Sequence, residues 1–364
     1  MQKYRILSYF CKLLKMNKEY HIIGLMSGTS LDGLDIVKCT FTKKIHWKFN
    51  LEKCETIKYS KKWEKTLKNL HQENQNVITE TDKYYGQFLG EKVNEFIAKH
   101  KIHADYISSH GHTIFHNPKN NFTLQIGSGE KISEMSEITT INNFRELDVS
   151  LNGQGAPLVP IGDLLLFPNY KYCLNLGGFA NISEKTEDKI ISFDICAVNF
   201  ILNILSNKIN LQYDKGGFES KKGNIKEDLL HQLNALDFFK KEAPKSLSRE
   251  WAESEIFPIL NRYNYSTTDK LRTFTEHIAI QIGKCLKNQS VLVTGGGAFN
   301  NFLMERIKFY SKSEIILPNA KIINFKEAII FAFLGVLRLE NINNCLSSVT
   351  GANTDSCSGD IYKK

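Results

Sequence analysis

Two short glycine turns, about 150 residues apart, constrain the fold of this chain more than any other feature of its sequence. Residues 21–37 read HIIGLMSGTSLDGLDIV, and residues 172–183 read YCLNLGGFANIS. Each segment predicts a β-hairpin, in which glycines at the turn let successive backbone N–H groups converge on an anion. Because the pattern occurs twice, it predicts a duplicated fold with a phosphate held between two lobes.

The rest of the chain alternates between predicted strands and helices. Strands are predicted at 50–59, 106–109, 113–116, 122–126, 139–142, 191–194 and 291–294, and helices at 81–100 (capped by Thr81), 198–206, 226–239, 249–263, 268–286 and 326–338. With 364 residues the chain is long enough for two domains. We expect an α/β, two-lobed, actin-like ATPase fold. Its predicted parts are a leader at 1–16, a first lobe at 17–160 and a second lobe at 161–364, whose last helix is a candidate to pack back on the first lobe.

The net charge of +8 does not indicate a nucleic-acid-binding protein. Residues 1–70 carry 15 Lys and Arg against 6 Asp and Glu, so the remainder of the chain is close to neutral. Much of the excess lies in the leader and in a lysine-rich run at 58–68, which we interpret as a solvated face. No nucleic-acid partner is expected.

The apolar segments and cysteines indicate a cytoplasmic protein. The longest strongly apolar run, 328–337, is about half the length that a bilayer requires. The 8 cysteines form no CxxC pair and fit neither a disulfide scaffold nor a zinc knuckle, which favours a reducing compartment. The basic leader lacks a small-residue cleavage site, and both a genuine extension and a true start at Met16 stay open.

A third glycine turn follows a predicted buried strand at 291–294. Its sequence, Gly295–Gly296–Gly297, permits close approach of the backbone to a flat ligand, although a tight structural turn is an equally good interpretation. The chain contains neither a GxxxxGK[ST] loop nor the protein-kinase motifs. If the chain uses ATP, it therefore belongs with the two-lobed phosphotransferases.

Three histidines lie close together in the sequence SHGHTIFH at 109–116. Strand alternation predicts that His110, His112 and His116 share one face. No Cys, Asp or Glu in the segment completes a metal site, so a metal is disfavoured against a polar-ligand site or a polar strand surface.

Two further features offer catalytic or binding groups. Asp194 ends a predicted strand just after the second hairpin, where it could act as a general base or cap the following helix, and the sequence does not separate these roles. The polar run at 143–157 offers Arg, Asp, Asn and Gln on a glycine-containing backbone, which suits a carbohydrate or an interdomain hinge.

Taken together, the motifs resemble those of the bacterial anhydro-N-acetylmuramic acid kinases. The matching segments are GLMSGTSLDGLDIV (24–37), SSHGHTIFHNP (108–118), TLQIG (123–127), NFRELDVSLNGQGAPLVP (143–160), CLNLGGFANIS (173–183), FD (193–194), PKSLSREW (244–251), VLVTGGGAFNNFLM (291–304) and VTGA (349–352). The resemblance implies a cytoplasmic, homodimeric kinase of peptidoglycan recycling. Such an enzyme opens the 1,6-anhydro bridge of its sugar with water and phosphorylates O6 with ATP and Mg²⁺.

The resemblance also implies roles for individual residues. Asp194 corresponds to the base that activates water. The residues implied in ATP binding are Gly28, Thr29, Ser30, Leu31, Asp32, Gly33, Leu34, Asp35, Gly177, Gly178, Gly295, Gly296 and Gly297. Those implied in sugar binding are His110, Gln125, Arg145, Asp148, Asn199 and Glu327. No metal site made of protein ligands alone is expected, since Mg²⁺ would arrive with ATP.

One segment departs from the family pattern. Many members follow the catalytic Asp with a turn like Cys-Gly-Pro-Gly-Asn, whereas this chain has Ile195–Cys196–Ala197–Val198 before Asn199. Loss of the glycines is expected to stiffen this turn and could alter substrate fit. The alternative functions are another sugar or small-acid kinase, an actin-like ATPase that binds partners, and a glycosidase with paired carboxylates.

Overall fold

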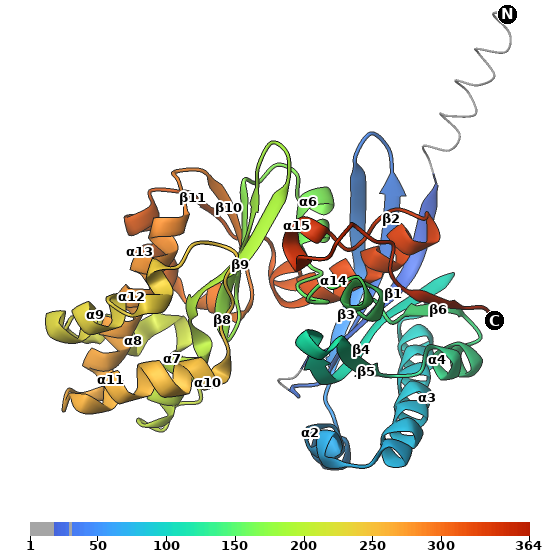
Figure 1. Ribbon diagram of the computed structural model, residues 1–364, viewed down its shortest axis with the longest axis horizontal. Coiled ribbons are helices and arrows are strands. Elements are labelled where there is room, and N and C mark those ends of the chain that lie inside the picture. The colour runs from blue at the N-terminus through green and yellow to red at the C-terminus, as the bar shows by residue number, and fades with distance from the viewer. Residues whose placement is uncertain (1–17, 29–30) are drawn as a thin grey trace, which may run out of the picture. The chain divides into compact units, whose positions relative to one another are not determined.

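The computed structural model describes residues 18–28 and 31–364. The predicted leader at 1–16 lies outside the described residues, as do Thr29 and Ser30 of the first turn. The described chain forms a mixed α/β fold in which each of two compact units has its own sheet (Figure 1).

The first unit is formed by two separate segments of the chain. It contains the residues up to 167 together with 325–364, and the second unit is 168–324. The predicted lobes, 17–160 and 161–364, differ from these units because the C-terminal residues join the first unit. They do so by pairing a C-terminal strand with the first sheet and by packing a long helix on it.

Both sheets have the same order of strands. The first has seven strands: β1 (Glu19–Ser27), β2 (Leu34–Lys43), β3 (Trp47–Ile57), β4 (Tyr106–Asn117), β5 (Phe122–Ile126), β6 (Thr139–Asn142) and β12 (Asp360–Tyr362). The second has five: β7 (Tyr172–Leu176), β8 (Phe179–Lys185), β9 (Ile190–Ala197), β10 (Ser290–Thr294) and β11 (Glu314–Ile316). In each sheet three antiparallel strands continue into two parallel ones, as β3-β2-β1-β4-β6 and as β9-β8-β7-β10-β11. This repeat confirms the predicted hairpin-led duplication and the actin-like fold.

Helices surround each sheet. Those of the first unit are α2 (Lys61–Asn69), η1 (Leu70–Gln72), α3 (Gln75–His100), η2 (Pro118–Asn120), α4 (Gly129–Ser136), α5 (Glu146–Ser150), α6 (Pro160–Leu166), most of α14 (Ala320–Leu339) and α15 (Ser347–Thr350). Those of the second are α7 (Asn199–Asn207), η3 (Lys215–Gly217), α8 (Phe218–Lys222), α9 (Glu227–Asn234), η4 (Asp237–Lys240), α10 (Arg249–Trp251), the π-helical turn η5 (Ala252–Ile256), α11 (Phe257–Arg262), α12 (Thr267–Cys285), η6 (Gly296–Phe299) and α13 (Asn301–Ser311).

The first sheet is covered on both faces. Side chains of α3, including Tyr85 and Leu89, form one core with Ile23 and Leu25 of β1. On the opposite face α14 lies very close to the strands, because a Cβ at Gly335 would come within 2.7 Å of the Ser108 side chain. Burial of apolar surface on both faces stabilises the sheet that carries the first glycine turn.

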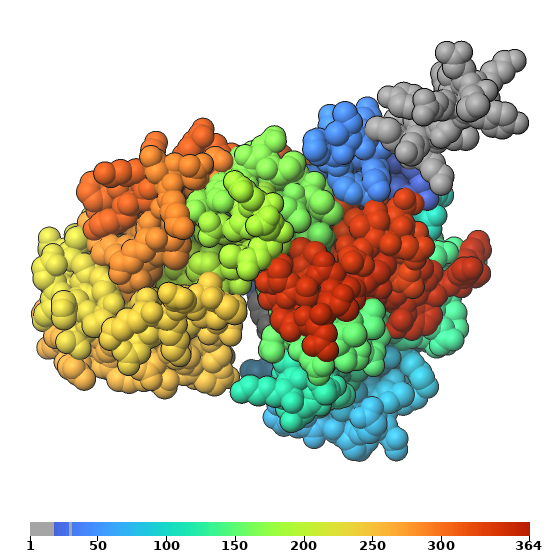
Figure 2. All heavy atoms as spheres, turned by 45° about the horizontal axis from the view of Figure 1, so that its top comes forward, coloured from blue at the N-terminus to red at the C-terminus, as the bar shows by residue number. Residues whose placement is uncertain are grey.

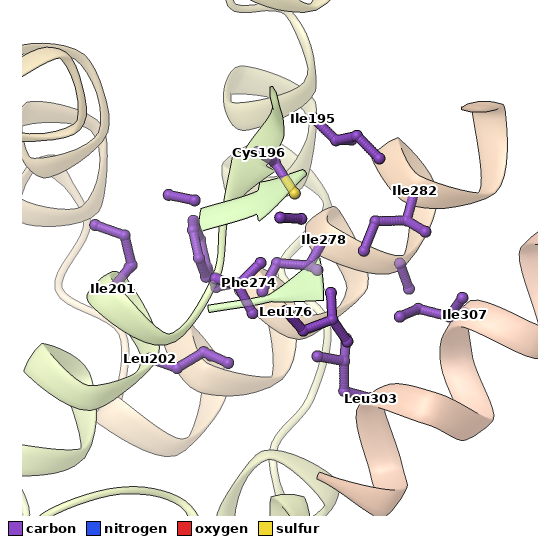
Figure 3. Packing of buried hydrophobic residues seen from close by; sticks show 14 of the residues in the cluster. Leu176, Ile195, Cys196, Ile201, Leu202, Phe274, Ile278, Ile282, Leu303 and Ile307 are labelled. Carbon is purple, nitrogen blue, oxygen red and sulfur yellow. The ribbon is translucent and has the colours of Figure 1, made fainter. Parts of the chain in front are cut away.

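The second unit has a separate core. The cluster joins strands β7–β10 to helices α7, α12 and α13, and Figure 3 shows Leu176, Cys196, Phe274 and Leu303 within it. In α12 the aligned apolar residues predicted to face the core do so. Leu271, Phe274, Ile278 and Ile282 are fully buried.

Several elements differ from their predicted bounds. The two strands predicted at 106–109 and 113–116 form the single strand β4, and α3 begins at Gln75 with Asn74 as its cap, so Thr81 lies inside the helix. The helix predicted at 226–239 ends at Asn234, because Leu236 is extended before η4. Helices α2 and α4 were not predicted. Their apolar sides are narrow, and Leu67 is the only buried residue of α2.

In the part of the chain that the structure describes, no helix is both long and apolar enough to cross a membrane.

Candidate active site

The first glycine turn connects β1 to β2. The last pair of the ladder is Ser27 with Leu34, and the Leu31 amide donates a hydrogen bond to the Gly28 carbonyl at 3.2 Å. Leu31 has a φ of 61° and Gly33 a φ of 148°, and a Cβ at Gly33 would lie 2.5 Å from the Ile57 carbonyl oxygen. This turn conformation therefore requires glycine at position 33.

Two carboxylates lie at this turn. Asp32 is exposed, whereas Asp35 is half-buried and accepts a hydrogen bond of 2.5 Å from the Thr56 hydroxyl. Burial, with smaller contributions from the charges of Glu327 and Asp32, raises the pKa of Asp35 to about 6, although the Thr56 hydroxyl acts in the opposite direction. Excess negative charge at Asp35 favours a nearby cation.

Arg145, one of the predicted sugar-binding residues, is oriented by hydrogen bonds from all three of its guanidinium nitrogens. Its Nε and Nη2 groups donate to His110 Nε2 at 3.1 and 2.8 Å, and Nη1 donates to the Gly155 carbonyl at 2.6 Å. His110 Nδ1 donates to the Gly111 carbonyl at 2.9 Å, so Nε2 is the acceptor of a neutral ring. Burial, and then the charge of Arg145, hold the pKa of His110 well below its usual 6.5.

The prediction that His110, His112 and His116 share one face is wrong. The His110 ring packs on Phe331 of α14, whereas His112 contacts Tyr85 of α3 on the other side of the sheet and bonds to the Ser27 hydroxyl at 2.8 Å. The reason is Gly111, which has a φ of 72° where the pairing of β4 with β1 changes register. One irregular residue reverses the alternation of the strand.

Asp148 holds the polar loop at 143–157 through buried hydrogen bonds. It is fully buried, and its two oxygens accept bonds from the Gly155 amide at 2.7 Å and the Thr350 hydroxyl at 2.8 Å. The Gln154 amide also donates to the Thr350 carbonyl. In Figure 2 the red C-terminal segment accordingly lies against the green segment that contains this loop. This placement gives Asp148 a structural contact with the loop that carries Gly155, and it identifies Thr350, which the sequence reasoning did not assign to the site.

Glu327 lies on α14 beside the buried ion pair of Lys326 with Asp163, whose charged atoms are 2.9 Å apart. The Glu327 side chain is accessible to solvent but surrounded by protein on most sides. This partial desolvation raises its pKa, while the positive charges of Lys326 and Arg145 act in the opposite direction. Glu327 and Arg145 therefore belong to one electrostatic group of the first unit.

Gln125 is half-buried on β5, paired with Thr113 of β4. Its amide donates to the Thr123 hydroxyl at 2.8 Å, so this side chain is oriented by its own strand.

Asp194 lies near the end of β9 in the second unit. Its Oδ2 accepts a bond of 2.8 Å from the Leu247 amide, and its own amide donates to the Lys245 carbonyl at 2.9 Å. Burial raises its pKa, against the effect of the Leu247 N–H. Since Val198 occupies the cap position of α7, the alternative prediction that Asp194 caps this helix is wrong. A carboxylate with a raised pKa and an accessible second oxygen suits a general base.

The second glycine turn is held by the start of α7. Amides of Val198 and Phe200 donate to the Gly178 carbonyl, and the Asn199 side chain donates to the Leu176 carbonyl at 3.0 Å. The departing residues, 195–198, are at most 2% exposed. The first three belong to the end of β9, which pairs with β8, and Val198 precedes α7. They form part of the core as well as the connection from Asp194 to α7.

A pocket of about 830 Å³ lies within the second unit. Gly296, Gly297 and Asn199 line it, whereas Gly177, Gly178 and Gly295 do not. Gly295 supports it instead. Its φ is 81°, and a Cβ there would lie 2.6 Å from the Asn175 side chain. The third turn thus brings backbone to the pocket wall through a conformation that needs glycine.

A second wall of this pocket was not predicted from the sequence. It is formed by residues of the segment 213–218, in which Gly216 lines the pocket and Gly216 and Gly217 have φ of 64° and 76°. Around the pocket Tyr213, Phe218 and Phe299 are 53%, 66% and 45% exposed, so apolar rings are available to a ligand. The Gly216–Gly217 pair was the signal that could have identified this wall. An apolar pocket with a few amide groups suits a flat heterocycle such as a nucleotide base.

Among residues 18–28 and 31–364, no three His, Cys, Asp or Glu side chains gather so that they could hold a metal ion.

These features define a class. A duplicated actin-like fold with a glycine-lined pocket at the end of β10 and a partly buried carboxylate on β9 fits a small-molecule kinase. The model of the anhydro-N-acetylmuramic acid kinase family matches residues 20–364, and the chain belongs to that family.

Curated relatives carry the same name. Anhydro-N-acetylmuramic acid kinase of Coxiella burnetii is 35% identical, over 95% of this chain and 98% of its own. The protein of that name from Mannheimia succiniciproducens is 32% identical, over 96% of this chain and all of its own, and that from Crocosphaera subtropica is 33% identical, over 94% and 98%.

Among solved structures, hexokinase from Schistosoma mansoni with glucose aligns at 9% identity over 87% of this chain and 85% of its own, with a TM-score of 0.41. Xylulose kinase from Lactobacillus acidophilus aligns at 10% identity over 94% and 93%, with a TM-score of 0.42.

Proposed function

We propose that this chain is an ATP-dependent kinase that hydrolytically opens 1,6-anhydro-N-acetylmuramic acid and phosphorylates O6, giving N-acetylmuramate 6-phosphate and ADP. The observation that carries the proposal is the family match over residues 20–364.

Asp194 is the proposed base. Its Leu247 contact fixes one oxygen of the carboxylate, and the other can take a proton from water as that water attacks the anomeric carbon. The bond from this carbon to the bridging O6 breaks, and O6 takes the γ-phosphoryl group while ADP leaves. Asp194 is then protonated, and the proton returns to solvent.

ATP is proposed to place its base in the pocket beside Gly296 and Gly297. The proposed phosphate contacts include Gly28 and its neighbours up to Asp35. Mg²⁺ brought by ATP would neutralise charge on the transferred phosphoryl group. Asp32 and Asp35 would hold the water ligands of this ion, which the excess negative charge at Asp35 supports.

Sugar binding is proposed for Arg145, Glu327 and Gln125 directly. His110 and Asp148 are engaged by protein groups, and we assign them to holding Arg145 and its loop. Asn199 lies at the pocket in the second unit, where it can contact substrate or nucleotide.

The deciding experiment is ADP release from Mg-ATP by the purified protein. It compares 1,6-anhydro-N-acetylmuramic acid with N-acetylmuramate and N-acetylglucosamine. Stimulation by the anhydro sugar alone is expected. Stimulation by an ordinary sugar would indicate another sugar kinase, and slow hydrolysis that no sugar stimulates would indicate a partner-binding ATPase.

We further propose that the enzyme works as a cytoplasmic homodimer in peptidoglycan recycling, with no nucleic-acid or membrane partner. This rests on the family resemblance. Light scattering of the purified protein would test the dimer, and accumulation of the anhydro sugar in a deletion strain would test the pathway.

A further inference from the structure

Arg145 is a partly buried cation. Burial lowers its pKa to about 10, yet no carboxylate lies within ion-pair distance of it among the described residues. Arg338 is likewise partly buried and donates to the neutral Gly359 carbonyl and Asn341 side chain, whereas two other partly buried arginines have an ion-pair partner. Arg272 and Arg306 both pair with Glu276, at 3.4 and 2.6 Å. The charges of Glu327 and Asp148 act on Arg145 only from beyond ion-pair distance, so a directly bound anion would further offset the cost of burying the guanidinium.

The contacts of Arg145 leave two of its five N–H groups available. His110 occupies the edge formed by Nε and Nη2, and Gly155 takes one hydrogen of Nη1. One N–H on Nη1 and one on Nη2 therefore have no protein partner in the described part of the chain. Two such groups on one guanidinium can donate to the oxygens of a carboxylate.

This arrangement is held from two sides. The neutral His110 ring is fixed by its hydrogen bond to the Gly111 carbonyl and by packing on Phe331, with the two ring centroids 4.5 Å apart. The Gly155 carbonyl is fixed through its own amide, which donates to the buried Asp148. The neutral His110 ring and the Gly155 carbonyl accept from Arg145 without neutralising it, and the Asp148 carboxylate acts on it only from beyond ion-pair distance. The guanidinium is thus oriented in advance, which lowers the entropy cost of binding an anion.

We propose that Arg145 binds the lactyl carboxylate of the substrate and thereby selects muramic over uncharged anhydro sugars. The inference rests on the proposed function, in which this carboxylate is the only ionised group of the sugar.

The test compares two substrates, 1,6-anhydro-N-acetylmuramic acid and its neutral lactyl carboxamide, with wild type, Arg145→Gln and Arg145→Lys. We expect Arg145→Gln to lower kcat/KM for the acid by about 10- to 100-fold, mainly through KM, and that for the amide by only a few-fold. Arg145→Lys keeps the charge but loses the fork, so it should keep part of the preference for the acid.

The matched control is Arg262→Gln, which removes an exposed arginine of the second unit and should leave both substrates unaffected. Retained ATP binding by the Arg145 variants checks that they fold. Equal losses on both substrates would overturn the inference and indicate that Arg145 serves the transferred phosphoryl group or the fold. An unchanged kcat/KM for the acid would also overturn it. Wild type that turns over neither compound would overturn the proposed function itself, and this inference with it.

Discussion

The carboxylates of this chain differ in what their oxygens contact. Asp148 is fully buried with both oxygens bonded to protein groups, whereas Asp194 has one oxygen bonded to a backbone amide. Asp35 is half-buried among other negative charges. A residue that must exchange a proton needs an accessible oxygen, and one that must hold a loop does not. Side chains of one type thus have different roles, and each role can be tested at its own residue.

Asp194→Asn should lower turnover by more than about 100-fold, because the amide cannot accept the proton of the attacking water. ATP binding, measured by calorimetry, should stay close to wild type. In the wild type, turnover should fall as the pH decreases. The midpoint of this fall should lie above 3.8, the usual pKa of Asp, since burial raises the pKa of Asp194. Turnover near the wild-type rate in the variant would remove Asp194 from the mechanism.

His110 can be tested with two substitutions of different chemistry. Gln can place an acceptor oxygen near the position of Nε2, whereas Phe fills the space without one. We expect His110→Phe to raise the KM for the sugar by about tenfold, which corresponds to one charge-assisted hydrogen bond, and His110→Gln to restore much of it. Because the pKa of His110 lies well below 6.5, the wild-type KM should be flat around neutral pH. Equal defects in the two variants would indicate a packing role only.

Asp35 is expected to lower the free energy of unfolding, because its carboxylate is partly buried at the turn. Its pKa is about 6 in the folded protein against 3.8 normally, so its favourable neutral form is lost as pH rises through 6. Asp35→Asn should therefore be more stable than wild type at pH 8, by at most about 1–3 kcal/mol, and equal to it near pH 4. Thermal unfolding of the nucleotide-free proteins at both pH values is the measurement. A stability difference that does not change with pH would contradict the assignment.

At the scale of the elements, a glycine in a turn can be needed for its backbone conformation or for the space that it leaves to a ligand. The sequence does not separate these two requirements. Gly295 needs its positive φ and has no room for a Cβ. Gly296 instead faces the pocket, where a Cβ would have the Asn199 side-chain amide as its nearest neighbour, at 3.7 Å. Gly295 is thus required by the backbone conformation, whereas Gly296 leaves space in the pocket for a ligand.

Alanine at each position should separate these requirements. Gly295→Ala should lower stability by about 1–3 kcal/mol, because the new side chain would strain the backbone. Gly296→Ala should unfold at the wild-type temperature but bind ATP several-fold more weakly, since its methyl group occupies pocket space. Thermal unfolding and calorimetric titration with ATP give both values. Unchanged ATP affinity in Gly296→Ala would count against the placement of the nucleotide.

In the molecule as a whole, the two units are built differently. The second is one continuous segment, 168–324, with its own core and the whole 830 Å³ pocket. The first needs its C-terminal segment, since Thr350 bonds to Asp148 and β12 pairs with β6. Only the second unit is therefore expected to fold as a single excised fragment.

The isolated fragment 168–324 should unfold cooperatively and bind ATP, more weakly than the full chain because the first glycine turn is missing. Circular dichroism and calorimetry would measure these properties. A fragment ending at 167 should be unfolded or aggregate, and it provides the matched comparison. Failure of 168–324 to fold would show that its core depends on the first unit.

The elements that could be predicted from sequence are those with local signals. The hairpins at both glycine turns and the apolar stripe of α12 follow from residue spacing, which a folded chain rarely overrides. Helix α2 was missed because four of its nine residues are lysine and only one residue is buried. The split of the helix predicted at 226–239 depends on one extended residue, Leu236. The second pocket wall at 213–218 was also missed, since no periodic pattern accompanies its glycines.

Turn chemistry and periodicity act over a few residues, so the amino-acid sequence alone was enough to specify the duplicated α/β plan, the glycine turns and the motifs that point to a sugar kinase. What each polar residue of these motifs contacts depended instead on tertiary packing. Asp148 is satisfied by Thr350, 202 residues away, and His112 faces away from His110 because Gly111 shifts the register of β4. Such contacts depend on how distant segments pack, and no local pattern encodes that packing.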